Sequence, residues 1–191
     1  MDNQPHEKIL VIGAAGQIGL ELVAALRDVY GNANVVASDI RIPNDSSLAN
    51  DGPFAIVNIL NETQLRETIE AYEITTVYML AAMLSAKAEQ NISAAWELNM
   101  NGLFNVLQCA KEGLINKLFW PSSIAVFGPN TPADSTPQET VCEPSTVYGI
   151  SKLAGEQWCN YFFHNYGVDV RSIRYPGLIG YKSEPGGGTT D

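Results

Sequence analysis

The stretch Lys8-Ile9-Leu10-Val11-Ile12-Gly13-Ala14-Ala15-Gly16-Gln17-Ile18-Gly19 is the strongest indication of the fold. The apolar run 8–12 predicts a buried strand, and the periodic pattern over 17–30 predicts a helix. Between them, three glycines with the spacing Gly-x-x-Gly-x-x-Gly allow a tight turn, close approach to a pyrophosphate and close packing of helix on strand. Helix N-terminal N–H groups favour bound phosphate. We therefore predict a dinucleotide-binding turn in which Gly13, Gly16, Gln17, Ile18 and Gly19 contact the cofactor.

Short apolar runs alternate with helical patterns along the rest of the chain, which is typical of a parallel sheet with crossover helices. We expect further strands at 34–38, 54–58, 75–80, 117–120 and 169–174 and further helices at 62–72, 92–113 and 147–166. Apolar spacing predicts the buried stripe of helix 92–113, which comprises Trp96, Asn99, Leu103, Val106, Leu107 and Ala110. The predicted class is α/β, a Rossmann-type doubly wound parallel sheet with helices on both faces.

Composition narrows the range of partners. The chain has 191 residues, with 11 basic and 21 acidic side chains and a net charge of −10, so nucleic acid is not an expected partner. Three cysteines without Cys-x-x-Cys spacing indicate free thiols in a reducing cytoplasm. The two histidines lack partners at ligand spacing, so no metal site is expected. Neither a signal peptide nor an apolar run of about 18 residues is evident, so we expect a cytoplasmic protein without a membrane partner.

Residues that follow the predicted strands extend the cofactor site. Asp39 ends the second strand, 20 residues after Gly19, where a carboxylate accepts hydrogen bonds from a ribose and repels a 2′-phosphate. NAD is therefore favoured, although Arg41 is a further candidate contact that leaves NADP open. Asn58 follows the third strand and is a candidate for binding adenine, but a loop asparagine is more often a turn residue. After the fourth strand, small side chains in Leu80-Ala81-Ala82 allow the backbone to approach the cofactor.

A second group of residues predicts proton and hydride transfer. Tyr148 and Lys152 are four residues apart, on one face of a predicted helix. Ser123 follows the fifth strand at its carboxyl end, where ligands bind in open α/β sheets. We expect Ser123 to hold the substrate oxygen and Tyr148, as phenolate, to remove the alcohol proton while hydride leaves for a nicotinamide. Lys152 is predicted to lower the pKa of Tyr148 and to bind the nicotinamide ribose, and Asn99 to anchor a proton-relay water.

With these motifs in order, the chain resembles the extended short-chain dehydrogenase/reductase family and, within it, the NAD-dependent L-threonine 3-dehydrogenases. The resemblance covers nearly the whole chain. Its main runs are 8–19, Leu84-Ser85-Ala86, Leu98-Asn99-Met100-Asn101-Gly102-Leu103, Pro121-Ser122-Ser123-Ile124-Ala125-Val126-Phe127-Gly128, Arg174-Tyr175-Pro176-Gly177-Leu178-Ile179 and Gly186-Gly187-Gly188-Thr189-Thr190-Asp191.

The resemblance implies an activity and further site residues. It implies oxidation of the 3-hydroxyl of L-threonine to 2-amino-3-ketobutyrate with NAD, by a homodimer formed through the helices that hold Asn99 and Tyr148. It makes Ser123 the catalytic hydroxyl, with Ser122 beside it. Substrate contacts are expected from Ser85 and Thr189, and cofactor contacts from Tyr175 and Pro176.

Two alternatives remain open. Nucleotide-sugar epimerases or dehydratases of the same family share both main motifs, but they usually carry Asn shortly after Arg-Tyr, where this chain has Pro176-Gly177. A dinucleotide-binding module without catalysis is the second alternative. We expect residues 1–180 to form the NAD-binding domain and the glycine-rich residues 181–191 to begin a substrate-binding loop or domain that is truncated. The absence of a Gly-x-Ser-x-Gly elbow gives serine hydrolase chemistry no support.

Overall fold

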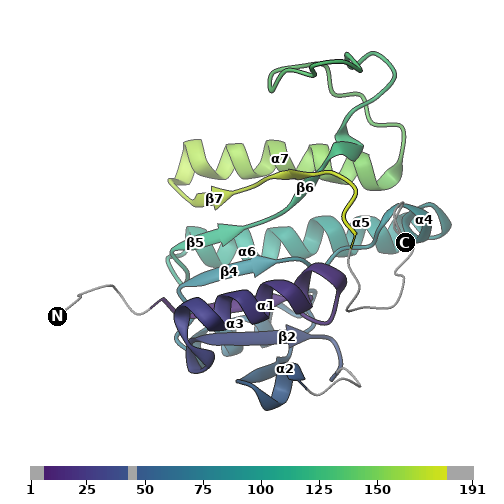
Figure 1. Ribbon diagram of the computed structural model, residues 1–191. Helices are drawn as coiled ribbons and strands as arrows, with labels where there is room; N and C mark the ends of the chain where they lie inside the picture. The colour runs from purple at the N-terminus through teal and green to yellow at the C-terminus, as the bar shows by residue number, and fades with distance from the viewer. Residues whose placement is uncertain (1–6, 43–46, 180–191) are drawn as a thin grey trace.

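A six-stranded parallel sheet forms the centre of the computed structural model, which describes residues 7–42 and 47–179 (Figure 1). The strand order is β3-β2-β1-β4-β5-β7, so the direction of progression reverses between β1 and β4. The strands are β1 (Ile9–Ile12), β2 (Val35–Asp39), β3 (Phe54–Ile56), β4 (Thr76–Met79), β5 (Lys117–Phe119) and β7 (Asp169–Arg171). The predicted Rossmann-type fold is confirmed.

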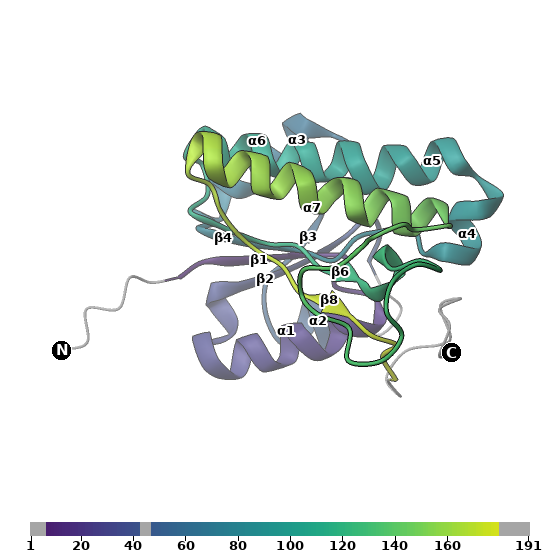
Figure 2. The ribbon, with the colours of Figure 1, turned by 90° about the horizontal axis from the view of Figure 1, so that it is seen from above.

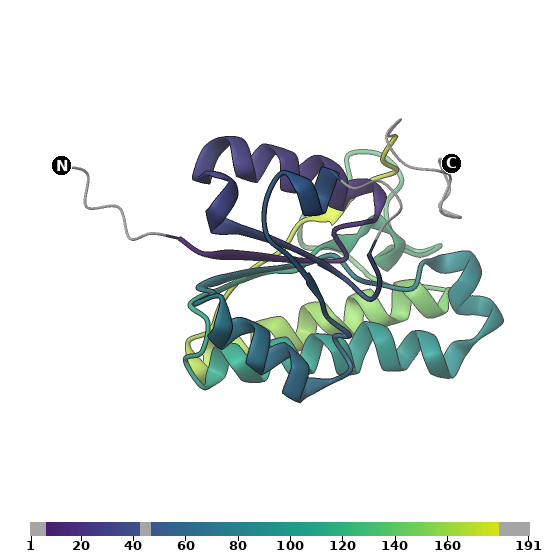
Figure 3. The same ribbon diagram turned by 90° about the horizontal axis from the view of Figure 1, so that it is seen from below.

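Helices cover both faces of the sheet (Figures 2 and 3). On one face lie α1 (Gln17–Tyr30) and α2 (Ser47–Asn50), and on the other lie α3 (Glu62–Ala71), α6 (Gly102–Lys111) and α7 (Val147–Tyr166). Successive side chains of β1 supply the two cores: Leu10 and Ile12 belong to the cluster that includes α3, α6 and α7, and Ile9 and Val11 to the cluster with α1. Burial on both faces explains the continuous apolar run that predicted β1. In the described part of the chain, no helix is long and apolar enough to cross a membrane.

The helix predicted over 92–113 is divided. After the short α4 (Ser85–Gln90), α5 (Ile92–Trp96) leads into a π-helical turn, η2 (Glu97–Asn101), and then into α6. Leu103, Val106 and Leu107 are buried as the stripe predicted, but Trp96 is 45% exposed. A π turn contains more than 3.6 residues, so residues before it fall out of phase with those after it. Asn99 lies inside this turn and is buried.

The strand predicted over 169–174 is also divided. β7 ends at Arg171, and the chain continues as β8 (Arg174–Tyr175), which pairs in parallel with β6 (Ser122–Ser123). This second, two-stranded sheet extends the carboxyl edge of the main sheet beside the start of α7 (Figure 2). A 3-10 turn, η3 (Ile124–Val126), follows β6, and the long loop 127–146 then projects from the body before α7 begins (Figure 1).

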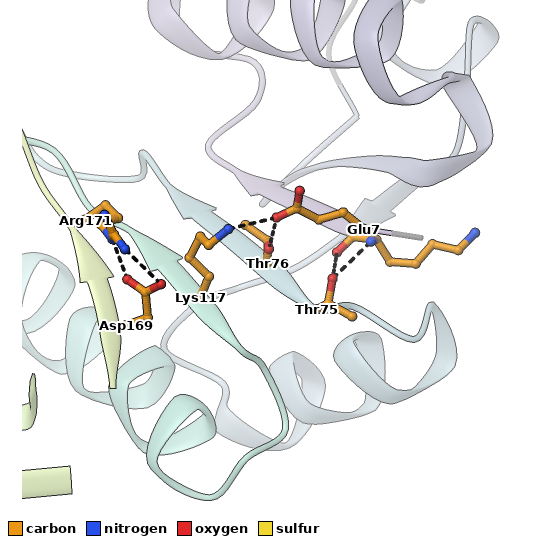
Figure 4. A network of polar contacts seen from close by, with 7 residues as sticks. Glu7, Thr75, Thr76, Lys117, Asp169 and Arg171 are labelled. Atoms are coloured by element: carbon orange, nitrogen blue, oxygen red, sulfur yellow. Dashed lines mark hydrogen bonds and ion pairs between the residues drawn. The ribbon is translucent and has the colours of Figure 1, made fainter. Parts of the chain in front are cut away.

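Charged side chains connect the strands at the opposite, amino-terminal edge (Figure 4). The Glu7 carboxylate accepts hydrogen bonds from the Thr76 hydroxyl at 2.6 Å and from the Lys117 ammonium at 3.4 Å. On β7, the Arg171 guanidinium donates to the Asp169 carboxylate. These contacts join β4, β5 and the chain entering β1, and they lie far from the carboxyl edge that holds the predicted site.

Candidate active site

A groove of about 250 Å³ opens at the carboxyl ends of β1 to β4, where the strand order reverses. Ligands bind at this switch point in open α/β sheets. The groove is lined by Ile12, Gly13, Gly16, Asp39, Ile40, Val57, Ile59, Leu80, Ala81, Ala82 and Leu98. The sequence predicted the two glycines, Asp39 and residues 80–82 as cofactor contacts. It did not predict the apolar side chains that also line the groove, namely Ile40, Val57, Ile59 and Leu98. Position directly after a strand was an available signal for Ile40 and Val57, whereas Leu98 reaches the groove only through the π turn.

The three glycines of the turn differ in the space that surrounds them. Gly13 has φ +85°, and a Cβ on it would lie 2.7 Å from the backbone N of Ala81. A Cβ on Gly19 would lie 2.5 Å from the carbonyl O of Gly13. In contrast, a Cβ on Gly16 would meet only the Gly13 carbonyl, at 3.4 Å. Packing thus demands Gly13 and Gly19, but the space at Gly16 lies on the groove, where a bare backbone suits a pyrophosphate.

The N-terminus of α1 is suited to an anion. Gly16 is its N-cap residue and has no side chain to cap the first amides. Two other helices have side-chain caps: Asn61 accepts a hydrogen bond at the start of α3, and Thr146 accepts one at the start of α7. Uncapped amides at a helix N-terminus seek an acceptor, and phosphate oxygens meet that need.

Asp39 is held rigidly at the rim of the groove. Its Oδ2 accepts a hydrogen bond from the Ala15 amide at 3.2 Å and its Oδ1 accepts one from the Ile40 amide at 2.8 Å. Each carboxylate oxygen retains acceptor capacity for a ribose hydroxyl. The bare turn, the uncapped helix and this carboxylate form a donor and acceptor set that fits an adenine dinucleotide.

The remaining predicted cofactor residues lie in less direct positions. Arg41 is exposed. Asn58 is also exposed, and its Oδ1 accepts a hydrogen bond from the Leu60 amide at 3.1 Å in the turn before α3, so adenine contact stays a prediction. The side-chain Nε2 of Gln17 donates to the carbonyl of Leu178 at 3.3 Å, which ties the start of α1 to the chain after β8. Ile18 and Tyr175 are half-buried, and Pro176 is exposed.

The two predicted substrate residues outside the catalytic group are only partly located. Ser85 is the first residue of α4 and is half-buried. Thr189 lies outside the described residues, as does the predicted boundary at 180–181. Within the described ranges, no group of three or more His, Cys, Asp or Glu side chains is arranged to hold a metal ion.

Ser123 and Tyr148 meet at the carboxyl edge. The Ser123 hydroxyl is the polar neighbour that lowers the pKa of the Tyr148 phenol, and it accepts a hydrogen bond from the Ala125 amide at 3.1 Å. Thr146 caps α7 through the Gly149 amide at 3.0 Å, which places Tyr148 in the first turn of the helix. The neighbouring Ser122 is buried and donates to Glu156 instead, so Ser123 is the serine that faces the phenol.

Lys152 lies beneath this pair and is 3% exposed. Its ammonium donates to the carbonyl of Pro121 at 2.7 Å and lies 4.3 Å from the centroid of the Trp120 ring. Burial lowers the pKa of Lys152 to about 7. Burial is also the main influence on the Tyr148 phenol and raises its pKa, against the opposing effect of the Ser123 hydrogen bond.

The direction of the Tyr148 shift differs from the prediction made from the Tyr-x-x-x-Lys spacing. That spacing does bring the Lys152 ammonium to 5.5 Å from the centroid of the Tyr148 ring. The hydrogen bond of the ammonium nevertheless goes to Pro121, and both side chains are removed from water. Desolvation disfavours both charged forms and outweighs the attraction that the spacing suggested.

Asn99 connects the groove wall to α7. Its Nδ2 donates to the Met83 carbonyl at 3.2 Å and to the Ser151 hydroxyl at 3.1 Å, and its Oδ1 accepts from the Met83 amide at 2.8 Å. Ser151 in turn donates to the Tyr148 carbonyl at 2.7 Å. Asn99 therefore ties the segment after β4 to the helix that carries Tyr148, and its predicted role in holding a relay water stays a prediction.

Comparison with known proteins gives consistent matches. The NAD dependent epimerase/dehydratase family matches residues 9–190. An uncharacterized epimerase/dehydratase of Staphylococcus saprophyticus is 49% identical over 185 residues, which are 97% of this chain and 58% of that protein. The L-threonine dehydrogenase of Cupriavidus necator, solved in its holo form, is 52% identical with a TM-score of 0.91, over 95% of this chain and 58% of that one. The L-threonine dehydrogenase of Clostridium difficile is 47% identical with a TM-score of 0.93, over 97% and 58%. The chain thus spans a little under three fifths of the length of these proteins.

Proposed function

The chain belongs to the NAD dependent epimerase/dehydratase family, and from that membership we propose that it carries the cofactor site and catalytic residues of an NAD-dependent L-threonine 3-dehydrogenase. NAD is the cofactor of the family. The observation that carries the proposal is that Ser123 neighbours the Tyr148 phenol, with the buried Lys152 ammonium 5.5 Å from the centroid of the Tyr148 ring, at the edge of a groove suited to a dinucleotide. Similarity to two threonine dehydrogenases supports the choice of substrate.

The chemistry assigns one task to each side chain. Ser123 donates a hydrogen bond to the 3-oxygen of threonine, and Tyr148, as phenolate, accepts the proton of that hydroxyl. NAD, held by the glycine turn and Asp39, would supply the acceptor for the hydride of the same carbon. Because burial raises the pKa of Tyr148, its phenol must lose a proton before it acts as base, and turnover in the oxidative direction rises as the pH increases. Lys152, with a pKa of about 7, exchanges protons readily at neutral pH.

The environment of Arg174 supports a small substrate. Its guanidinium binds the Glu156 carboxylate through two hydrogen bonds, of 2.8 and 2.7 Å, and is therefore committed to a partner within the chain. The following residues, Pro176-Gly177, add no cation for a diphosphate. A zwitterionic amino acid needs no such group, whereas a nucleotide sugar does. The epimerase or dehydratase activity of the same family is the alternative, supported by the description of the Staphylococcus relative.

The deciding assay gives the natural protein that contains this sequence L-threonine and UDP-galactose as separate substrates. It measures NADH formation with both and the conversion of UDP-galactose to UDP-glucose. We expect NADH formation with threonine only. Epimerisation of UDP-galactose without threonine oxidation would contradict the proposal. Calorimetric titration with NAD tests the non-catalytic module: saturable NAD binding without turnover, even at high threonine, would favour that reading.

The assembly and location of the protein are further parts of the proposal. We propose a cytoplasmic homodimer that forms through the helices holding Asn99 and Tyr148. Large exposed apolar side chains on α5 and α7 support this interface, namely Ile92, Trp96, Ile150, Trp158, Tyr161 and Phe163. Sedimentation velocity at micromolar concentration tests it: Trp158→Glu should yield monomers, and a monomeric wild-type protein would contradict the dimer.

A further inference from the structure

The two-stranded sheet of β6 and β8 has one side toward α7 and one side toward the catalytic edge. Its register pairs Ser122 with Arg174 and Ser123 with Tyr175. Side chains alternate along a strand, so Ser122 and Arg174 share one face, and Ser123 and Tyr175 the other. Two residues per strand form few backbone hydrogen bonds, so this sheet needs side-chain contacts to keep its place.

Glu156 of α7 supplies those contacts from behind. Its Oε1 accepts hydrogen bonds from the Ser122 hydroxyl at 2.5 Å and from Arg174 Nε at 2.8 Å, and its Oε2 accepts one from Arg174 Nη2 at 2.7 Å. The side chains of Glu156 and Arg174 are only 13% and 21% exposed. Burial opposes ionisation, but the hydrogen bonds of Arg174 and Ser122 prevail and lower the pKa of Glu156. One partly buried carboxylate thus connects both strands to α7.

The helix holds the segment before Ser123 at two points, one turn apart. Lys152 donates to the Pro121 carbonyl, and Glu156 accepts from the Ser122 hydroxyl. The Lys152 ammonium has three N–H donors, so its predicted contact with the nicotinamide ribose is compatible with the hydrogen bond to Pro121. Glu156 adds the side-chain contact that also reaches β8.

We propose that Glu156 is a positioning residue: through Ser122 and Arg174 it holds the Ser123 hydroxyl against the Tyr148 phenol and fixes the chain leaving β8 at the catalytic edge. Its effect on turnover rests on the proposed function, but its effect on the Ser123–Tyr148 hydrogen bond does not. Glu156 itself need not touch substrate or cofactor.

The test follows the titration of Tyr148 by NMR of protein labelled with ¹³Cζ-tyrosine, with the signal assigned through Tyr148→Phe. The Ser123 hydrogen bond lowers the pKa of Tyr148. Glu156→Gln should therefore raise it, as Ser123→Ala does, and the double variant should raise it no further than Ser123→Ala alone. We also expect kcat with threonine to fall about 10- to 100-fold, as for a misplaced catalytic group, with the dissociation constant of NAD unchanged within about twofold.

Glu112→Gln is the matched control, since Glu112 forms a two-point pair with Arg66 on the surface between α3 and the end of α6. It should leave both the Tyr148 titration and kcat unchanged. Ser122→Ala removes one hydroxyl and is expected to shift the Tyr148 pKa upward by less than Glu156→Gln. If Glu156→Gln does not fold, the Tyr148 titration in Ser122→Ala tests whether the contact between Glu156 and Ser122 positions Ser123.

The proposal is overturned if the Glu156 and Ser122 variants titrate like the Glu112 control. Absence of threonine oxidation in the wild type would instead contradict the proposed function. In that case the titration alone still decides whether Glu156 positions Ser123.

Discussion

The two edges of the sheet use polar side chains in opposite ways. At the amino edge, Glu7, Lys117, Asp169 and Arg171 pair with opposite charges near water, and the Arg171 side chain is 70% exposed (Figure 4). At the carboxyl edge, Lys152 is almost completely buried and donates to a carbonyl, not to a carboxylate.

The polar groups of the two edges differ in their effect on the free energy of folding. Exposed pairs add little free energy and are screened by salt, whereas a buried ammonium costs free energy of folding. Such groups persist where chemistry needs a shifted pKa. The proposed catalytic site at the carboxyl edge therefore lowers the stability of the fold, whereas the ion pairs at the amino edge add little stability and take no part in that site.

The sharpest test of the contrast is Tyr148→Phe. Loss of the phenol removes the proposed base, so we expect threonine oxidation to fall about 10³-fold while NAD affinity changes by less than about threefold. Tyr72→Phe, which alters a partly exposed tyrosine at the end of α3, is the control and should keep full activity. Steady-state kinetics and calorimetry provide the two measurements. If most activity survives in Tyr148→Phe, the base lies elsewhere.

A pair of glycine substitutions separates packing from cofactor binding within the carboxyl edge. Gly13→Ala combines positive φ with a Cβ 2.7 Å from the Ala81 N, so we expect a loss of about 2–4 kcal/mol in the free energy of unfolding. Gly16→Ala has room within the protein and should fold normally, yet weaken NAD binding about tenfold, because its methyl group enters the groove.

Chemical denaturation and calorimetry measure these effects. Gly113→Ala, with φ +78° and no atom within 4 Å, isolates the backbone strain alone, which should cost about 1 kcal/mol. If Gly16→Ala binds NAD as tightly as the wild type, the prediction that a pyrophosphate binds at this turn is contradicted.

The pH dependence of stability tests the buried ammonium. The pKa of Lys152 is about 7 in the folded protein, below the ordinary lysine value of 10.5, so the unfolded chain binds more protons between these values. The free energy of unfolding should therefore rise by about 2 kcal/mol from pH 7 to pH 9. Above pH 9 the buried Cys159 thiol, whose pKa is raised to about 12, lowers the free energy of unfolding as the pH increases. In Lys152→Met the rise should vanish, and urea titrations across this range would show it. If the free energy of unfolding of Lys152→Met still rises between pH 7 and pH 9, another group causes the rise.

The smallest effect is expected at the amino edge. Glu7→Gln breaks the partly exposed pair with Lys117, and we expect a loss of less than about 1 kcal/mol in the free energy of unfolding, most of which disappears in 1 M salt. Thermal unfolding at low and high salt measures the difference. A larger loss that resists salt would show that the two edges are not as different as their contacts suggest.

Prediction from the sequence was most accurate where local residues mark both ends of an element. The bounds of α1 and α7 agree with the predicted 17–30 and 147–166, because Gly31 and Gly167 follow their last residues and Thr146 precedes α7. The glycine turn and Asp39 were likewise placed at the groove. The divided helix over 92–113 and the divided strand over 169–174 were missed, since both breaks arise where the chain adapts to neighbouring segments.

The sequence by itself determined the order of the main strands and long helices, the dinucleotide turn and the side chains available for proton transfer, because those depend on residue types at short spacing. Only the tertiary structure decided which serine faces Tyr148, where the Lys152 ammonium points and that Glu156 joins Ser122 to Arg174. These contacts link residues 18 to 34 positions apart or depend on burial, and no local pattern contains them. The direction of the pKa shift at Tyr148 followed from the same cause, since desolvation is a property of the packed molecule and not of the Tyr-x-x-x-Lys spacing.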